Sequence, residues 1–344
     1  MQALVLAGGA GTRLRPLTLT VPKPVMPLAG RPFLSFMLDW LAAHGVREAI
    51  LSCGFLAADV ERVLGGEHGD IALRYVTEEE PLGTAGPVRL AADLGVLEER
   101  LLVLNGDVLT DLDLSALIAR HGETRAVATI ALVAVDDPSS YGVVPTAADG
   151  RVEAFLEKQS GPTPTNRINA GAYVLERRAV EGMAAGRAVS FEREVFPALA
   201  DRDELYAYLA EGYFNDIGTP ERYLEATRDL LTGTVASSLP ERTASGSLIH
   251  ADARVEGAEV GGLSVVGARC ELAPEARLSG AVLFDGVRIG ARASVLDSIV
   301  AERAVVEEGA RIEGGAVVGA GARVAGGAYV GAGARVPPGE RVAS

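Results

Sequence analysis

The sequence has few cysteines and no long apolar run, and each scarcity excludes a class of protein. Cys53 and Cys270 are the only cysteines among 344 residues, and they form no metal-binding spacing. A disulfide framework is therefore excluded, and a reduced cytoplasmic protein is the simplest expectation. No uncharged apolar run approaches the roughly twenty residues that span a bilayer. The apolar start is too short for a signal peptide and lacks a basic segment before it.

Positive charge is also scarce. The chain has 32 Lys and Arg against 46 Asp and Glu, which gives a formal net charge of −14. This balance argues against a nucleic-acid backbone or an anionic membrane as partner. With 48% hydrophobic and 23% charged residues, the chain has the composition of a folded protein with a large core. Its length allows a full α/β domain and a second module.

The first 38 residues reverse the charge balance of the whole chain. They contain Arg13, Arg15, Lys23 and Arg31, and no acidic residue precedes Asp39. The local electrostatic field is therefore expected to be opposite to the global one, which suits a polyanionic ligand.

A glycine-rich loop lies within this basic segment. The apolar run that ends at Ala7 predicts a buried strand, and Gly8, Gly9 and Gly11 follow it. Glycine lets the backbone pass close to a ligand, and successive N–H groups in such a turn attract phosphate. The dinucleotide fingerprint requires a third glycine where Leu14 stands, and the Walker A loop requires a Gly-Lys-Ser/Thr that is absent. A plain glycine turn with surface arginines is the remaining alternative.

The run LAGGAGTRLRPLT followed by PKP resembles the signature of the sugar-nucleotide pyrophosphorylases. These enzymes join a nucleoside triphosphate to a sugar 1-phosphate. The resemblance implies that Arg13 grips the triphosphate and the pyrophosphate, and that Lys23 neutralises the reacting α-phosphate. It also implies a nucleotide-binding loop made of Leu6, Ala7, Gly8, Gly9, Gly11 and Thr12.

Strand and helix patterns alternate through the first 232 residues. This rhythm indicates βαβ units and a doubly wound, mostly parallel α/β sheet of the Rossmann-like kind. A helix is expected to open at Gly30-Arg31-Pro32, with Pro32 in its first turn, and to end at Gly45. A second helix is expected at 57–64. Strands are expected at 48–53, 71–77, 101–104, 129–135 and 141–144.

Two strings resemble the mannose-1-phosphate guanylyltransferase branch of the family. The first, PLGTAG, feeds a helix whose N-terminus adds partial positive charge. From the residues alone it could equally be a capped helix start, but the resemblance implies that Glu80, Gly83 and Thr84 face the base. The second string is SFEREVF, in which Ser190 and Glu192 predict a helix start.

Two aspartates are candidates for binding a metal ion. Asp107 follows a buried strand, at the end where open α/β sheets bind ligands, although an Asp that caps the next element is the alternative. The run LNGDVLTDLDL resembles the family's Gly-Asp metal motif, which implies that Asp107 is a Mg²⁺ ligand. Asp111 and Asp113 are predicted turn and cap residues. The resemblance makes Asp216, in GYFNDIGTPERYLEA, the second acid on the metal.

Three further segments resemble the family's sugar-binding elements: Tyr141-Gly142, VEAFLEK and INAGAYVLE. They imply that Gly142, Glu157 and Asn169 orient the sugar and that Lys158 contacts its phosphate. As a lone residue, Asn169 would more often be a turn residue.

The last hundred residues carry a repeat. Residues 233–246 have a linker composition, and they would separate a catalytic domain at 1–232 from a module at 247–344. In that module aliphatic residues recur every six positions, a period that predicts a hexapeptide parallel β-helix. The pattern resembles the left-handed β-helix attached to many pyrophosphorylases. The phased residues are Val266, Leu272, Leu278, Phe284, Val300, Val306, Ile312, Val318, Val324, Val330 and Val336.

The β-helix could be a second enzyme or an assembly module. Hexapeptide acyltransferases generally need a His base near the coils, and His250 is the only His beyond His121. We therefore expect a module that pairs copies of the chain into a homo-oligomer.

The patterns together predict a nucleotidyltransferase that joins a nucleoside triphosphate to a sugar 1-phosphate with the help of Mg²⁺ and releases pyrophosphate. GTP and mannose 1-phosphate are the favoured substrates. One alternative is a pyrophosphorylase for another sugar or cyclitol 1-phosphate with another triphosphate. The other is a noncatalytic regulatory subunit that binds a nucleotide sugar, and the intact Arg13, Lys23, Asp107 and Asp216 argue against it.

Overall fold

A computed structural model describes residues 1–344 except residues 55, 157–162, 238 and 240–242. The described residues form two compact units. Residues 1–9 and 34–214 make the first unit, and residues 10–33 and 215–344 make the second. The basic segment and residues 215–232 thus pack in one unit with the repeat region. The predicted functional boundaries at residues 232 and 247 stay a prediction. Among the described helices, none has both the length and the apolar character needed to cross a membrane.

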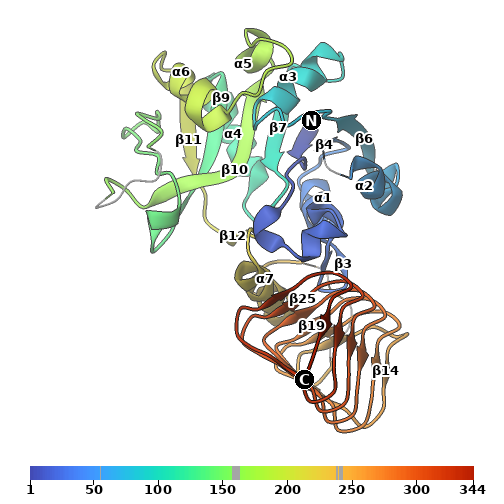
Figure 1. Cartoon of the computed structure of the whole chain (residues 1–344). Helices are drawn as coiled ribbons and strands as arrows, with labels where there is room; N and C mark the ends of the chain where they lie inside the picture. The colour runs from blue at the N-terminus through green and yellow to red at the C-terminus, as the bar shows by residue number, and fades with distance from the viewer. Residues whose placement is uncertain (55, 157–162, 238, 240–242) are drawn as a thin grey trace. The chain divides into compact units, whose positions relative to one another are not determined.

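Eight strands form the central sheet of the first unit. They are β1 (Gln2–Leu6), β4 (Glu48–Cys53), β5 (Glu67–His68), β6 (Ile71–Thr77), β7 (Arg100–Asn105), β9 (Ala128–Ala134), β10 (Arg167–Glu176) and β11 (Leu205–Leu209). Their order is β11-β9-β10-β7-β1-β4-β6-β5 (Figure 1). Strands β4, β6 and β7 join β1 in a parallel core, whereas β10 runs antiparallel to both of its neighbours. The predicted mostly parallel, Rossmann-like sheet is confirmed.

The sheet is covered on both faces, which explains its continuous apolar strands. Leu4 and Val5 are successive residues of β1 and point to opposite faces, yet neither has any exposed surface. The helices of this part of the chain are α1 (Phe33–Ala43), α2 (Ala57–Leu64), α3 (Gly86–Asp93), α4 (Leu114–Thr124), α5 (Arg178–Glu181) and α6 (Phe196–Ala200), which a π-helical turn, η5 (Phe191–Val195), precedes.

Two predicted elements in this region are wrong. Pro32 lies in β3 (Arg31–Pro32), which pairs with β2 (Pro27–Leu28), and not in a helix. The Phe33 N–H donates to Met26 O at 3.0 Å and so extends that hairpin, and the helix follows it. The segment 141–144 is not a strand, because only Val143 forms isolated bridges. It follows a 3₁₀ turn, η4 (Pro138–Ser140).

Three parallel sheets form the repeat region of the second unit. One contains β13 (Leu248–Ile249), β16 (Val265–Val266), β19 (Val282–Leu283), β22 (Ile299–Val300), β25 (Val317–Val318) and β28 (Arg335–Val336). The next contains β14 (Arg254–Val255), β17 (Glu271–Leu272), β20 (Arg288–Ile289), β23 (Val305–Val306), β26 (Arg323–Val324) and β29 (Arg341–Val342). The third contains β15 (Glu259–Gly261), β18 (Arg277–Ser279), β21 (Ser294–Leu296), β24 (Arg311–Ile312) and β27 (Tyr329–Val330). This arrangement confirms the predicted β-helix and is consistent with the left-handed form.

The six-residue phase is wrong at one position, Phe284. Leu283 pairs with Val266 and Val300 in neighbouring coils and lies in the core, so the step from Leu278 to Leu283 is five residues. Coils with a five-residue step advance 17 residues, as from Val266 to Leu283. Phe284 is buried outside the coil instead.

The helix α7 (Pro220–Thr232) packs in the same unit as the β-helix. The ring of Tyr223 lies 6.3 Å from that of Phe284, which accounts for the burial of both side chains. Ion pairs join Arg228 to Asp297 at 2.7 Å and Glu221 to Arg335 at 3.0 Å.

Burial of the outer faces distinguishes the three sheets of the β-helix. The outward residues Val265, Val282, Ile299 and Val317 of the sheet that begins with β13 are buried. The equivalent positions of the other two sheets are mostly exposed Arg and Glu. Four strands of the sheet that begins with β13 thus carry a buried apolar residue on their outer face.

Candidate active site

The end of β1 determines where Asp107 lies. Ala7 donates its N–H to Ser52 O at 2.8 Å, and Gly106 donates its N–H to Leu6 O at 2.9 Å. A Cβ on Gly106 would lie 2.7 Å from that oxygen, so only glycine permits this approach. The Asn-Gly-Asp turn is thereby held against the last residue of β1, and Asp107 follows at the carboxyl end of the sheet.

A second close approach shapes the glycine loop. A Cβ on Gly8 would lie 2.6 Å from Glu78 Oε1, and one on Gly54 would lie 2.9 Å from Gly8 O. The Glu78 carboxylate accepts hydrogen bonds from Ser52 Oγ at 3.0 Å and from the Leu82 N–H at 3.2 Å. Glu78 therefore supports the loop, a role that the sequence analysis missed. Its signal is its place directly after the strand that ends at Thr77.

The remainder of the loop is open. No atom lies within 4 Å of a Cβ placed on Gly9, and the residue is exposed. Thr12 is exposed as well. The backbone here is accessible to a ligand, as a phosphate-binding turn requires.

The segment predicted to face the base packs against the SFEREVF segment. Gly83 has φ +77°, and a Cβ there would lie 2.5 Å from Val189 O. The Thr84 hydroxyl donates to Glu192 Oε2 at 2.8 Å and accepts from the Phe191 N–H at 2.8 Å. Gly83 and Thr84 thus connect two stretches that are far apart in the sequence.

Ser190 begins the π-helical turn, as the sequence predicts for a helix start. Its hydroxyl accepts from the Arg193 N–H at 3.3 Å and donates to Glu192 Oε2 at 2.7 Å. One oxygen of Glu192 therefore accepts hydrogen bonds from two hydroxyl groups. Glu80, the third residue assigned to the base, is exposed.

Asn169 lies at an irregular point of β10. The strand register with β9 shifts between Asn169 and Tyr173. Gly171, within this bulge, has φ +70° and donates its N–H to Asn169 Oδ1 at 2.9 Å. Asn169 Nδ2 donates to the Tyr173 hydroxyl at 2.7 Å. The bulge thus turns the side chain of Asn169 back along its own strand.

The remaining residues of the predicted sugar site are described only in part. Gly142 is half-buried between the 3₁₀ turn and the bridges of Val143. Next to it, the ring of Tyr141 meets that of Phe214 edge-on at 6.3 Å. Glu157 and Lys158 lie outside the described residues.

In the second unit, Arg13 and Asp216 face each other. Arg13 belongs to the 3₁₀ turn η1 (Thr12–Leu14), and Asp216 ends β12 (Phe214–Asp216). Arg13 Nη2 lies 4.0 Å from Asp216 Oδ2, and the arginine side chain is 65% exposed. A Cβ on Gly218 would lie 2.7 Å from Arg13 Nη2, so the guanidinium lies over a glycine turn. The cation is held in position and is open to an anion.

Lys23 is buried although it carries a charge. It begins the 3₁₀ turn η3 (Lys23–Val25) and is only 8% exposed. Thr18 Oγ1 donates to Gly11 O at 2.8 Å and folds the loop back toward this lysine. Lysine is almost never this buried unless its side chain is paired, so the burial of Lys23 is unusual.

The carboxylates present fit a hard divalent cation. Among the described residues, no three or more His, Cys, Asp or Glu side chains form a metal-binding cluster. Mg²⁺ in enzymes of phosphate chemistry usually takes one or two carboxylates and completes its shell with water and substrate phosphates. Asp107, in the first unit, and Asp216, in the second, each carry carboxylate oxygens of the kind that Mg²⁺ prefers.

The two cysteines take no part in chemistry of this kind. Both are free and buried. Burial, with the charges of Glu78 and Glu61, raises the pKa of Cys53 to about 12. Burial likewise raises the pKa of Cys270 to about 11. Neither is a thiolate at neutral pH, so a cysteine nucleophile is excluded.

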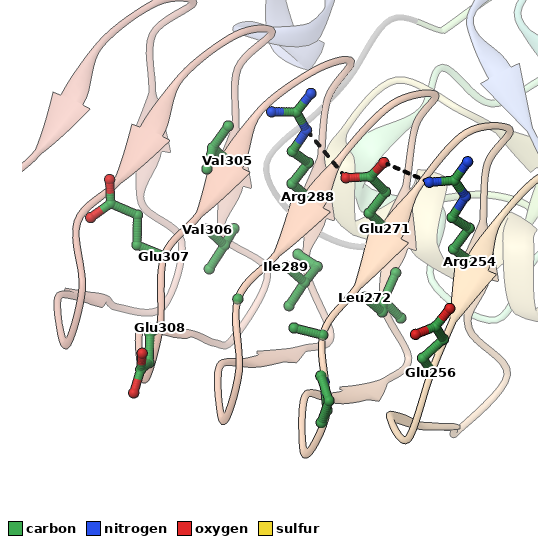
Figure 2. A pocket seen from close by; sticks show the side chains of 13 residues that line it. Arg254, Glu256, Glu271, Leu272, Arg288, Ile289, Val305, Val306, Glu307 and Glu308 are labelled. Atoms are coloured by element: carbon green, nitrogen blue, oxygen red, sulfur yellow. Dashed lines mark ion pairs between the residues drawn. The ribbon is translucent and has the colours of Figure 1, made fainter.

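The β-helix has a groove of its own (Figure 2). It has a volume of about 500 Å³ and is lined by residues of the sheet that contains β14, β17, β20 and β23. Glu271 pairs there with Arg254 at 3.7 Å and with Arg288 at 3.5 Å. None of the lining residues is a His, so this groove offers no base for acyl transfer.

Comparisons with known proteins agree with this arrangement. Residues 2–233 match the family model described as nucleotidyl transferase, and residues 244–343 match the GMPPB C-terminal domain. The mannose-1-phosphate guanylyltransferase of Mycobacterium tuberculosis is 45% identical over 295 residues, which cover 85% of this chain and 82% of that protein. The probable mannose-1-phosphate guanylyltransferase 2 of Arabidopsis thaliana is 36% identical over 337 residues, which cover 92% and 90%.

A solved structure is also similar. The crystal structure of HddC from Yersinia pseudotuberculosis superposes with a TM-score of 0.58 at 30% identity, and the match covers 67% of this chain and 99% of that one. A crystal structure of the same protein complexed with GMP-PN gives a TM-score of 0.57. The family resemblance read from the signature loop is confirmed. This chain belongs to the nucleotidyl transferase family and is related over most of its length to mannose-1-phosphate guanylyltransferases.

Proposed function

We propose that this protein transfers the guanylyl group of GTP to mannose 1-phosphate and forms GDP-mannose and pyrophosphate. An oxygen of mannose 1-phosphate attacks the α-phosphorus of GTP. A new P–O bond forms there, and the bond to the oxygen that bridges to the β-phosphate breaks. The observation that carries the proposal is the cation-bearing glycine loop in a chain 45% identical to a mannose-1-phosphate guanylyltransferase.

The glycine loop would bind the triphosphate. Its residues Leu6, Ala7, Gly8, Gly9, Gly11 and Thr12 would place backbone N–H groups around the phosphates. Arg13 would hold the departing pyrophosphate. Its exposed guanidinium, held over Gly218, supports that role because a planar fork of donors matches phosphate oxygens.

Lys23 would meet the negative charge that grows around the α-phosphorus. A buried ammonium group acts in a region of low dielectric constant, where its attraction for that charge is stronger than in water. Because it is already positioned, little reorganisation is needed when the charge develops. Phosphoryl-group chemistry of this type depends mainly on such positioning and charge neutralisation.

Asp107 and Asp216 would hold a divalent cation, which we assign as Mg²⁺. When bound, such an ion neutralises phosphate charge and makes the α-phosphorus more electrophilic. The two carboxylates would supply oxygen ligands to that cation.

The base would be recognised by the PLGTAG segment. Glu80, Gly83 and Thr84 would face it, and the Thr84 bonds to Glu192 and Phe191 would keep the segment in shape. An exposed carboxylate such as Glu80 can accept from the exocyclic amine of guanine, a donor that adenine does not offer in that position.

The sugar would be held by Gly142, Glu157 and Asn169, with Lys158 on its phosphate. Asn169 supports this assignment because its amide is fixed by two hydrogen bonds in the bulge of β10. A fixed amide loses less entropy when it binds a hydroxyl group than a mobile one.

The experiment is a matrix of five nucleoside triphosphates against several sugar 1-phosphates, scored by pyrophosphate release. We expect GTP with mannose 1-phosphate to give the highest kcat/KM. A higher value for another sugar or cyclitol phosphate would replace the substrate but keep the reaction class. Absence of release in every combination would favour a regulatory subunit; no observation on this chain favours either alternative at present.

We further propose that the protein is cytoplasmic and assembles into a homo-oligomer through the β-helix. Free buried cysteines support a reducing compartment. Exposed flat sheets of the β-helix support pairing between copies. Light scattering that reports a monomer for the full chain would contradict the assembly.

A further inference from the structure

A buried polar network lies behind Asn169. Its centre is Tyr173, a residue of β10 with no exposed surface. The Tyr173 ring packs against Phe191, at a centroid distance of 5.7 Å, and against Phe196, at 5.0 Å. Phenylalanine would fill such an apolar setting equally well, unless the tyrosine hydroxyl forms a hydrogen bond that the protein needs.

The hydroxyl holds a residue near the proposed reaction centre. Asn169 Nδ2 donates to it at 2.7 Å. Tyr173 pairs with Val103 in the register of β10 and β7, so Asn105 is the residue two positions further along β7. The Asn105 side chain lies against the bulge of β10, because a Cβ on Gly171 would lie 2.8 Å from Asn105 Nδ2.

The Asn105 amide lies beside this pair of side chains. Its Oδ1 is buried and accepts no hydrogen bond from the part of the chain that the structure describes.

Two carboxylates help to keep the proton on the Tyr173 hydroxyl. Burial raises the pKa of Tyr173, the negative charge of Glu192 raises it further, and Asp107 acts in the same direction. The hydroxyl is therefore protonated at neutral pH.

The hydrogen bonds of the Asn169 side chain show which of its groups is left for a ligand. Its Oδ1 accepts from the Gly171 N–H, and one of its two Nδ2 hydrogens goes to Tyr173. The second hydrogen is left for a ligand, so Asn169 presents a fixed N–H donor.

We propose that Tyr173 is a positioning residue that fixes the Asn169 amide, so that its second N–H donates to a sugar hydroxyl. The inference rests on the proposed function, because it assumes that a sugar lies against Asn169.

The test removes the hydroxyl alone, with Tyr173→Phe. Calorimetry measures Kd for GDP and for GDP-mannose, and the ratio of the two isolates the contribution of the sugar. Loss of one hydrogen bond that positions the contact is expected to reduce this ratio about tenfold, which corresponds to about 1.4 kcal/mol. Kd for GDP is expected to stay within about twofold of the wild-type value.

Tyr223→Phe is the matched control. Tyr223 is also fully buried, and its hydroxyl donates to Pro27 O, outside the proposed sugar contacts. It should lower the melting temperature to a similar extent and leave the ratio unchanged. Asn169→Ala is the second variant. It keeps Tyr173 but removes the amide that the hydroxyl holds, and it is expected to reduce the ratio even if Tyr173→Phe does not fold. An unchanged ratio in this variant would overturn the proposal.

A double variant tests whether Tyr173 acts through Asn169. In an Asn169→Ala background, Tyr173→Phe should change the ratio little, because the group that it positions is gone. Equal losses for GDP and GDP-mannose, or fully additive losses, would overturn the proposal. A wild-type protein that binds GDP-mannose no better than GDP would instead contradict the proposed substrate, and the ratio is then measured with the sugar nucleotide that the enzyme forms.

Discussion

The central sheet and the β-helix of this protein place their polar groups in opposite ways. In the described β-helix the interior is aliphatic, and buried serines such as Ser264 bond the backbone of the next coil. In the sheet, two of the polar side chains near the proposed site lie where the backbone is irregular. Asn169 lies at a bulge, and Asn105 precedes a glycine that touches β1. The regular coils of the β-helix thus form a support, whereas the irregular backbone of the sheet places polar side chains at the proposed active site.

The largest effect is expected from substitution of Asp107, a proposed metal ligand. Asp107→Asn keeps the shape of the side chain but removes its charge, so it should abolish metal-dependent activity while the protein stays folded. Activity is measured against Mg²⁺ concentration, and folding by circular dichroism. An unchanged dependence on the metal would refute the role of Asp107 as a ligand.

Loss of the buried cation should have the next largest effect. Lys23→Ala is expected to lower kcat by about 10²–10³, as removal of one preorganised contact to transition-state charge typically does. The matched control is Arg303→Ala, which removes an exposed cation of the β-helix and should leave kcat unchanged. Near-normal turnover in Lys23→Ala would rule out its assigned role.

A core substitution in the β-helix should lower the stability of the protein without changing substrate binding. Ile312 is fully buried among stacked aliphatic residues, so Ile312→Ala should cost about 2–5 kcal/mol in the free energy of unfolding. At temperatures where the variant is folded, KM for both substrates should stay unchanged. A raised KM without loss of stability would show that the β-helix takes part in substrate binding.

The smallest effect concerns His121, a buried histidine of helix α4. Burial lowers the pKa of His121 below 6.5, although its hydrogen bond to Glu176 opposes the change. Below pH 6.5 the unfolded chain therefore binds a proton that the folded chain resists, so stability falls as the pH falls from 6.5 towards the folded-state pKa. Denaturant unfolding between pH 5 and 8 should show this slope, and His121→Gln should flatten it. An equal slope in both proteins would contradict the assignment.

The β-helix could be predicted from the sequence because each coil repeats the same local requirement. The prediction failed at Phe284, where a five-residue step moves Leu283 into the core and Phe284 onto Tyr223. A period shows where residues stack but not where a coil shortens. The covered outer face was readable in strands such as Val265–Val266, where both residues are apolar.

The site could be predicted only where its constraints are local. Glycine-rich turns such as Gly8-Gly9 can be recognised in the sequence, because few other residues permit such a close approach of the backbone. Glu78, Glu192 and Tyr173 were missed as functional residues, because their partners come from distant parts of the chain. Thr84 and Glu192, for example, are 108 positions apart. Their contacts follow from the packing of the sheet and not from any short pattern.

The most direct test of the account follows the α-phosphorus. The enzyme is incubated with mannose 1-phosphate, Mg²⁺ and GTP labelled at its α-phosphate, and the labelled products are separated. The account predicts that the label moves into GDP-mannose with one pyrophosphate released per transfer, and that Lys23→Ala slows this transfer. Label that stays in GTP, or transfer that is as fast without Lys23, would contradict it.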